Sequence, residues 1–241
     1  MAILITGASG KLGKSLKTLY PDALTPSHKE LDIRSEANVL EYIKSNAPTT
    51  IFHSAAMTGI RQCENDKKLA YKTNVIGTEN LVKACMKSSP NCCLVYISTA
   101  SVFAGDVGNY AEDDVPDPKN YYSLSKLLGE FAIRESSLKR WMVIRTNFVE
   151  RAKWQYEKAF TDRFGTYLFA DDLALALKDV VDRGLQGILH VCGAEKMSMF
   201  DLAKITTPNV KPTTMSEYSG PPLPTDMSLR STRIQPYEIS K

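Results

Sequence analysis

The first residues of the chain constrain its fold more than any other stretch. An apolar run from Ala2 to Thr6 ends in three glycines at a spacing of three, Gly7, Gly10 and Gly13. Leucines at positions 12, 16 and 19 then have the spacing of an amphipathic helix. In such a strand–turn–helix the glycines permit a tight turn and a close approach to a pyrophosphate, which rests on the helix N-terminus. The N-terminus therefore predicts a dinucleotide-binding unit.

Strand and helix patterns alternate along the chain after this unit. Short apolar segments predict strands at 22–24, 50–53, 93–97 and 141–144, and amphipathic segments predict helices at 39–43, at 69–86 and from Tyr122 onward. This order predicts an α/β fold with a Rossmann-like, doubly wound parallel sheet, whose ligands bind at the carboxyl ends of the strands. The residues expected at such ends are Gly7, Ala55, Thr99 and Arg145.

A tyrosine and a lysine on one predicted helix indicate proton-transfer chemistry. Tyr122 and Lys126 stand one helical turn apart, so both side chains leave the same face. The ammonium is expected to stabilise the phenolate and to lower the pKa of Tyr122 toward the working pH. Thr99, at the end of a preceding strand, can orient a substrate carbonyl beside the phenol. A Tyr-x-x-x-Lys pair alone is common on helices, and the N-terminal glycine motif is what favours a catalytic role for it.

Several further motifs resemble those of a known family. They are Ala55-Ala56-Met57-Thr58 followed by Cys63-Glu64, Ile97 to Gly105, Tyr122 to Glu130, and Phe164-Gly165 before Ala170 to Ala174. With the glycine motif, they make the chain similar to the extended short-chain dehydrogenases/reductases, and most similar to the dTDP-4-dehydrorhamnose reductase group. The resemblance extends from residue 1 to about residue 235.

The resemblance implies an NADP(H)-linked reductase that acts on a nucleotide-activated 4-keto-6-deoxy sugar, in the biosynthesis of dTDP-rhamnose and cell-surface polysaccharide. Tyr122 would supply the proton, Lys126 would tune it and bind the nicotinamide ribose, and Thr99 would hold the carbonyl oxygen. The chain departs from the group at Ala100-Ser101, in a shortened segment between Arg145 and Ala170, and at Leu223-Pro224. These departures concern the substrate more than the chemistry.

The expected contacts fall into two sets. Cofactor contacts are expected from Gly7, Ser9, Gly10, Lys11, Leu12, Gly13, Ser27, Lys29, Asp32, Ile33, Ala55, Ala56, Asn74, Ser98, Tyr122 and Lys126. Substrate contacts are expected from Thr58, Ser101, Arg145 and Asn147. For Arg145, at a strand end, two other roles stay open, which are pairing with a carboxylate and framing the nicotinamide pocket. No metal is expected, because no Cys/His cluster has the spacing of a zinc site.

The segment after the second predicted strand favours NADPH, although NADH stays possible. Dinucleotide folds that select NAD usually place a carboxylate there to bind the ribose diol. Here the segment Thr25 to Lys29 offers hydroxyl, imidazole and ammonium groups and no carboxylate before Glu30. These groups suit a 2′-phosphate, with Ser27 and Lys29 as its expected contacts.

Two alternatives remain open. A nucleotide-sugar epimerase with tightly bound NAD has a similar pattern, but the chain is short for its substrate domain. A non-catalytic, NADP-binding regulatory subunit shares the fold, although the complete set of Thr99, Tyr122 and Lys126 argues against it. A 4,6-dehydratase is less favoured, because those enzymes usually carry Asp-Glu after the catalytic threonine.

Length and composition set the remaining expectations. With 241 residues and 43% apolar content, the chain can bury one large core and a small lobe. We expect a dinucleotide-binding domain at 1–147, completed by about 166–193, and a small C-terminal substrate-binding lobe at about 148–165 and 194–241.

A net charge of +3 is too small to suggest nucleic acid, and no apolar run is long enough to span a membrane. Five cysteines, an odd number, fit a reducing cytoplasm, and we expect a monomer or homodimer. Among single residues, His53 is expected to be a packing residue, and Glu64 a solvated helix charge.

Overall fold

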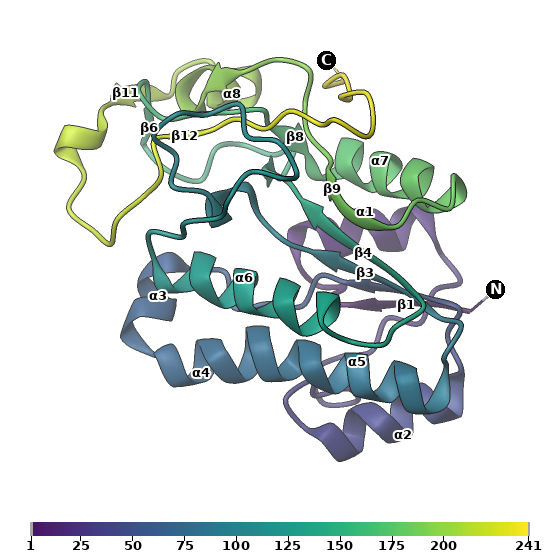
Figure 1. The fold of residues 1–241 in the computed structure, drawn as a ribbon. Helices are drawn as coiled ribbons and strands as arrows, with labels where there is room; N and C mark the ends of the chain where they lie inside the picture. The colour runs from purple at the N-terminus through teal and green to yellow at the C-terminus, as the bar shows by residue number, and fades with distance from the viewer. Residues whose placement is uncertain (1, 241) are drawn as a thin grey trace.

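The computed structural model describes residues 2–240, and its centre is a five-stranded parallel sheet (Figure 1). The strand order is β1 (Ile3–Thr6), β2 (Thr50–His53), β3 (Cys93–Ile97), β4 (Arg140–Arg145) and β9 (Gly187–His190). Their middle residues are buried on both faces, which is why these strands are continuous apolar runs rather than alternating ones. The predicted α/β fold is confirmed. Residues 1 and 241, the outer limits of the predicted domains, lie outside the described residues.

Helices cover both faces of this sheet. On one face, α1 (Lys11–Leu19) packs beside α7 (Ala170–Asp182), and the other face carries α2 (Glu36–Asn46), α5 (Gly77–Ser88) and α6 (Tyr121–Arg134) (Figure 1). Leu12 and Leu16 of α1 enter one apolar cluster with the sheet, while Val39, Ile43 and Leu81 enter the cluster on the opposite face. The two clusters hold the strand ends in fixed positions, as a binding site at those ends requires.

The predicted strand at Asp22–Leu24 is wrong. Only Leu24 pairs with β1, through a single bridge to Leu4 in which its N–H donates to Ile3 and its carbonyl accepts from Ile5. Prolines at positions 21 and 26 bracket this residue, and proline has no N–H with which to extend a ladder. The chain therefore makes one sheet contact here and continues as an irregular segment.

The predicted helix at 69–86 exists but is interrupted. After a short helix α3 (Ile60–Asn65), α4 (Lys67–Tyr71) continues into a π-helical turn (Lys72–Ile76) and then into α5. Asn74 lies in the π turn, and its side chain accepts from Met57 N (2.7 Å) and donates to Met57 O (2.9 Å). Single π turns within helices often mark functional sites, and this one secures the segment that follows β2.

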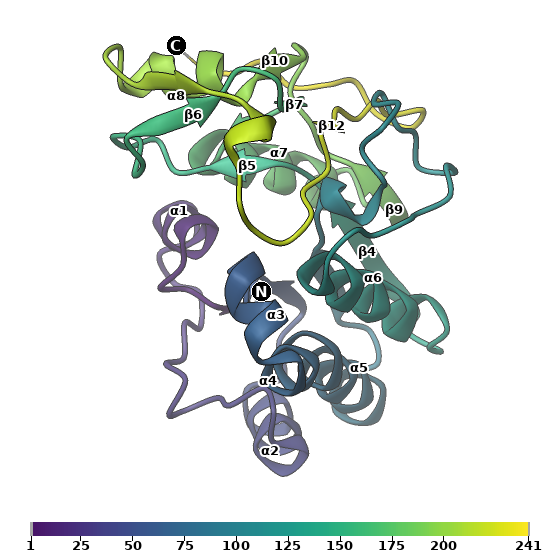
Figure 2. The same ribbon diagram turned by 90° about the vertical axis from the view of Figure 1, so that its left-hand side faces the viewer.

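A small lobe lies above the sheet in Figure 2. It contains α8 (Met199–Thr206) and three small groups of strands: β6 (Lys158–Phe160) with β11 (Lys211–Thr213), β7 (Phe164–Gly165) with β10 (Met197–Ser198) and β12 (Asp226–Met227), and β5 (Phe148–Val149) with β8 (Leu168–Phe169). Two single 3-10 turns occur at Ala100–Val102 and Met215–Glu217. The domain limits stay a prediction. Within residues 2–240, no helix combines the length and apolar character needed to cross a membrane.

Candidate active site

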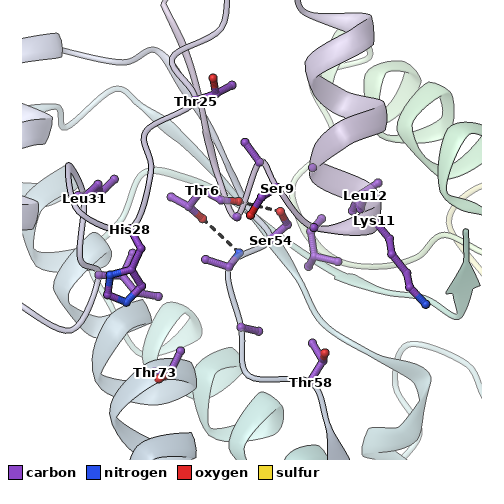
Figure 3. Close-up of a pocket in the computed structure, with 18 of the residues that line it drawn as sticks. Thr6, Ser9, Lys11, Leu12, Thr25, His28, Leu31, Ser54, Thr58 and Thr73 are labelled. Atoms are coloured by element: carbon purple, nitrogen blue, oxygen red, sulfur yellow. Dashed lines mark hydrogen bonds between the residues drawn. The ribbon is translucent and has the colours of Figure 1, made fainter.

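A cleft of about 860 Å³ runs along the carboxyl ends of β1 to β4. The glycine-rich turn forms its floor, with Thr25, His28 and Leu31 on one side of the turn and Lys11 on the other (Figure 3). A second cavity, of about 990 Å³, adjoins it and shares Lys11, Thr58 and Phe148 with it. The two cavities therefore form one continuous site between the sheet and the small lobe.

The three glycines of the turn have different roles. Gly7 has a φ of +72°, and a Cβ there would lie 2.7 Å from Ala55 N. A Cβ on Gly13 would lie 2.2 Å from Gly7 O, whereas one on Gly10 would meet only Gly7 O, at 3.2 Å. The turn itself therefore requires glycine at positions 7 and 13, where a side chain would meet backbone atoms. At Gly10 the missing side chain instead leaves space in the cleft.

Helix α1 begins at this turn without a side-chain cap. Its N-cap is Gly10, and its first turn contains no acidic residue. The first N–H groups of a helix have no intrahelical partner, so here they are free to bind an anion with the help of the helix dipole. The turn fits the pyrophosphate of a dinucleotide.

Residues of the segment 25–34 line the far end of the cleft, and two of the cofactor contacts expected there are not among them. Ser27 and Ile33 line it as predicted, but Lys29 is exposed and lies outside it. Asp32 is also outside, because its carboxylate accepts from Arg34 Nε (2.8 Å) and Nη2 (2.9 Å), which lowers the pKa of Asp32. Arg34 itself lines the cleft, and the sequence prediction missed it. The available signal was the position of this arginine, two residues beyond Asp32.

Thr99, Tyr122 and Lys126 lie at the opposite end of the same cleft. Thr99 follows β3, Tyr122 lies in the first turn of α6, and Lys126 follows one turn later. Lys126 is 2% exposed, and its ammonium lies 3.9 Å from the centroid of the Tyr96 ring. The sequence predicted that these three side chains share one site, and the structure brings them together.

The expected lowering of the Tyr122 pKa by Lys126 is wrong. Burial raises the pKa of Tyr122 to about 12, and interaction with the Thr99 hydroxyl only partly opposes this. Burial also lowers the pKa of Lys126 to about 7, against the opposing effect of the Glu130 carboxylate. Desolvation is the largest influence on the pKa of both groups, and the Lys126 ammonium lies over the Tyr96 ring. Tyr122 therefore keeps its proton near neutral pH, as a proton donor must.

Two residues fix the start of the catalytic helix. Asn120 caps α6 by accepting from Ser123 N (3.0 Å), and Glu64 of α3 accepts from Tyr121 N (2.7 Å). The expectation that Glu64 is a solvated charge is therefore wrong, because its carboxylate satisfies an open N–H at the helix end. The Cys63-Glu64 motif was the feature of the sequence that could have indicated a structural role for Glu64.

Arg145 does not line the cleft, so its predicted substrate contact is corrected, and the alternative that it pairs with a carboxylate is the one observed. It is 1% exposed, and its Nη2 lies 2.8 Å from Glu130 Oε2. Glu130 also accepts from the Ser98 hydroxyl. A buried guanidinium requires such a partner, because an unpaired buried charge is very costly. The pair connects β4 to α6 and fixes the orientation of the helix that carries Tyr122 and Lys126.

The other predicted residues divide between lining and support. Thr58 and Asn147 line the cleft, and Asn147 Nδ2 donates to Met227 O (2.9 Å). Ser101 does not line it, and its hydroxyl lies 2.8 Å from Thr99 Oγ1. The other predicted cofactor residues that line the cleft are Gly7, Ser9, Gly10, Lys11, Leu12, Gly13, Ala55, Ala56 and Ser98.

Two buried polar residues support the cleft from behind. Asn74, predicted as a cofactor contact, is 1% exposed and directed to Met57 and to the Ser125 hydroxyl (2.8 Å), so that prediction is corrected. His53 is 1% exposed and bonds Thr6 (2.8 Å) and Thr78 (3.1 Å), which confirms its packing role.

The second cavity has an excess of unpaired positive charge. Its three acidic residues, Glu150, Glu157 and Glu217, each pair with a lysine. Four cations that line it form no ion pair within residues 2–240, namely Lys11, Arg61, Lys153 and Arg163. A cavity with paired acids and free cations is suited to an anionic ligand.

Arg163 differs from the other three cations because it is half-buried, whereas Lys11, Arg61 and Lys153 are exposed. Its Nε donates to Pro224 O (3.1 Å), while Nη1 and Nη2 face the sulfur atoms of Met199 (3.8 Å) and Met227 (3.4 Å). Thioethers are weak acceptors, and burial lowers the pKa of Arg163. The guanidinium therefore has donors left for a ligand.

Comparison with known proteins yields consistent matches. The family model described as the RmlD substrate binding domain matches residues 1–235. A dTDP-4-dehydrorhamnose reductase from Aggregatibacter actinomycetemcomitans is 30% identical over 227 residues, which cover 83% of this chain and 76% of that protein. The structure of a dTDP-4-dehydrorhamnose reductase from Bacillus anthracis in complex with NADP superposes with a TM-score of 0.86 at 28% identity, covering 95% of this chain and 91% of that one.

A relative with a different description is also similar. The methionine adenosyltransferase 2 subunit beta from Bos taurus is 26% identical over a gapped alignment of 282 positions, which covers 99% of this chain and 83% of that protein. The fold thus occurs in proteins that are described as reductases and in one that is described as a subunit of another enzyme.

Proposed function

The chain belongs to the RmlD substrate binding domain family, in the extended short-chain dehydrogenase/reductase superfamily, and on that premise we propose that it is an NADPH-dependent reductase of a nucleotide-activated 4-keto-6-deoxy sugar in dTDP-rhamnose biosynthesis. The observation that carries the proposal is the site itself. Thr99, Tyr122 and Lys126 lie at one end of a dinucleotide cleft, beside the opening into a cationic cavity.

The residues of the cleft fit NADPH. The uncapped start of α1 receives the pyrophosphate, and Ser27, His28 and Arg34 at the far end offer donors to a 2′-phosphate. When bound, the cofactor supplies the hydride that reduces the keto carbon. Lys126, which is buried beside the cleft, binds the nicotinamide ribose in this arrangement.

The protein's own groups manage the proton and the carbonyl. Thr99 holds the substrate oxygen, and Tyr122 donates its phenolic proton to that oxygen as negative charge develops on it. Burial raises the pKa of Tyr122 to about 12, so the phenol is protonated at neutral pH, as a phenol with the ordinary value of about 10 also is. The pair of Arg145 with Glu130 fixes the helix that carries the phenol, and the small lobe covers the substrate.

The second cavity accommodates the nucleoside diphosphate of the substrate. Its free cations offset the phosphate charges, and Arg163 presents unused donors in the fork geometry that phosphates accept. The aromatic side chains of Trp154, Tyr156 and Tyr218 also line the cavity and supply flat apolar faces for a base.

We predict that Arg163→Met raises the KM for the nucleotide sugar roughly 10–100-fold, because one charge-assisted hydrogen bond contributes about 1.5–3 kcal/mol. The Kd for NADPH, measured by fluorescence titration, should not change. Lys158→Met is the matched control, because Lys158 lines the same cavity but is paired with Glu217 (3.1 Å). A KM that changes equally in both variants would contradict a specific role for Arg163.

We predict that Arg34→Ala lowers the preference for NADPH over NADH roughly 10–100-fold. The change removes a charged donor, worth about 1.5–3 kcal/mol, and leaves the nearby Asp32 carboxylate without the guanidinium that pairs with it. The ratio of kcat/KM for the two cofactors measures this. Lys29→Ala should leave the ratio unchanged, because Lys29 is exposed outside the cleft. A shift with Lys29→Ala but none with Arg34→Ala would reverse our interpretation.

One other function has a specific observation in its favour. The similarity to a methionine adenosyltransferase subunit covers 99% of this chain, which favours a cofactor-binding regulatory subunit as the second candidate. An assay of NADPH oxidation against a panel of nucleotide-linked 4-keto sugars separates the two. Turnover with any of them supports the reductase, and cofactor binding without turnover supports the subunit.

We also propose that the enzyme works in the cytoplasm as a monomer or homodimer. All five cysteines are free and buried, which suits a reducing compartment. Light scattering of the purified chain tests the oligomeric state.

A further inference from the structure

An irregular segment of the small lobe forms part of the wall of the second cavity. Residues 218–224, which we call the strap, form neither helix nor strand. Tyr218, Ser219 and Leu223 of the strap line the cavity. Figure 2 shows the strap as part of the yellow loop that hangs from the small lobe toward α3 and α6. This part of the wall therefore depends on contacts with other elements to hold its place.

The two ends of the strap are anchored within the lobe. Directly before it, the Glu217 carboxylate pairs with the Lys158 ammonium (3.1 Å). At its last residue, Pro224 O accepts from Arg163 Nε (3.1 Å). The residues between these two anchors have no such contact with the lobe in the hydrogen bonds of the described chain.

The middle of the strap is instead held by side chains from the other side of the cavity. Arg61 of α3 donates from Nη2 to Ser219 O, and Asn120, directly before α6, donates from Nδ2 to Pro222 O (3.0 Å). Arg61 is exposed, whereas Asn120 is 5% exposed. A hydrogen bond from a buried amide is the more firmly placed of the two, because its donor has no competing water.

Asn120 uses both halves of its amide. Its Oδ1 caps α6 by accepting from Ser123 N (3.0 Å), two residues before which Tyr122 enters the cleft from the same first turn. An aspartate would cap a helix equally well, but its carboxylate has no donor for the strap. The asparagine therefore connects the start of the helix that carries Tyr122 to the wall of the second cavity.

We propose that Asn120 is a substrate-positioning residue, whose amide N–H holds the strap and so keeps Tyr218 and Leu223 in place around the nucleotide of the substrate. This inference rests on the proposed function, because that function assigns the second cavity to the nucleoside diphosphate. Since the amide oxygen alone caps the helix, loss of the N–H should weaken substrate binding and leave the chemistry at Tyr122 unchanged.

Asn120→Asp and Asn120→Ser separate the two halves of the amide. Both keep an oxygen that can cap α6, so Tm, kcat and the Kd for NADPH should stay near the wild-type values. Both lose the N–H, so the KM for the nucleotide sugar and the Kd for dTDP, measured by calorimetry, should rise roughly 3–10-fold. The serine variant shows that the added charge of aspartate is not the cause.

Limited digestion with chymotrypsin reports on the strap directly. Both variants, without ligand, should be cut after Tyr218 faster than the wild type, because the strap is no longer held in its middle. Cleavage after Tyr156, which is 62% exposed, is the internal reference and should keep its rate. Mass spectrometry of the fragments distinguishes the two cuts.

Two alanine variants complete the test. Asn120→Ala loses the cap as well as the strap contact, so it should lower Tm and also raise the Kd for dTDP. Ser35→Ala removes the cap of α2, which lines neither cavity, and should lower Tm without changing that Kd. A wild-type Kd for dTDP in both Asn120→Asp and Asn120→Ser, or an equal rise with Ser35→Ala, would overturn the proposal. A wild type that binds dTDP but reduces no nucleotide sugar would overturn the proposed function, and the dTDP affinities and cleavage rates of the variants would still decide this inference.

Discussion

Replacing Tyr122 with phenylalanine is expected to lower kcat roughly 10²–10⁴-fold, the usual contribution of general acid catalysis. The change removes only the phenolic hydroxyl, and the ring remains to fill its place in the cleft. Because Thr99 and Lys126 keep their positions, the Kd for NADPH should change little. Steady-state assays of NADPH oxidation with a nucleotide 4-keto sugar give kcat, and fluorescence titration gives the Kd.

Tyr121→Phe is the matched control for this variant. Tyr121 precedes Tyr122 on α6, but its ring lies near Lys67 rather than in the cleft. Its loss of a hydroxyl should leave kcat close to the wild-type value. Turnover by Tyr122→Phe at a near wild-type rate would remove Tyr122 from the mechanism.

Replacing Gly13 with alanine is expected to destabilise the protein severely. The added Cβ would lie 2.2 Å from Gly7 O and 2.6 Å from Ala8 Cα, both rigid backbone atoms. Overpacking of this kind costs about 3 kcal/mol, which exceeds the gain of about 1 kcal/mol from alanine's helix propensity. The net cost is therefore about 2 kcal/mol, and for a chain of this size we expect Tm to fall by roughly 4–8 °C.

Gly10→Ala separates folding from cofactor binding. Its Cβ would meet only Gly7 O, at 3.2 Å, so Tm should stay near the wild-type value. The methyl group would occupy the space that a pyrophosphate needs, and the Kd for NADPH should rise. Equal Tm values for the Gly13 and Gly10 variants would show that the turn tolerates a side chain at both positions.

The sequence predicted those elements whose pattern is locally complete. The buried strands, the glycine turn and the catalytic helix each carry their own signal, and all are present. Asp22–Leu24 failed as a strand because neighbouring prolines limit pairing, which apolarity alone does not reveal. The π turn at Lys72–Ile76 was also not predicted, because helical spacing does not show where the backbone hydrogen bonds change partner.

The predicted site residues differ in how far the sequence could place them. Thr99, Tyr122 and Lys126 share one cleft as the spacing required. Arg145 is not a substrate contact but pairs with a carboxylate, one of the two other roles left open; its partner, Glu130, lies on another element, so the sequence could not identify it. The raised pKa of Tyr122 was missed for a similar reason, since desolvation depends on burial by the whole fold.

The most direct test of the account is hydride transfer to a sugar. The protein would be incubated with NADPH deuterated at nicotinamide C4 and with a dTDP-linked 4-keto-6-deoxy sugar, and the product would be examined by mass spectrometry. C4 carries two hydrogens, one on each face of the ring, and only one of them is transferred. NADPH labelled at each of the two positions is therefore tested separately. The account predicts a reduced sugar that carries deuterium from one of them, and loss of this product with Tyr122→Phe. An unreduced sugar, from a protein that nonetheless binds NADPH, would contradict it.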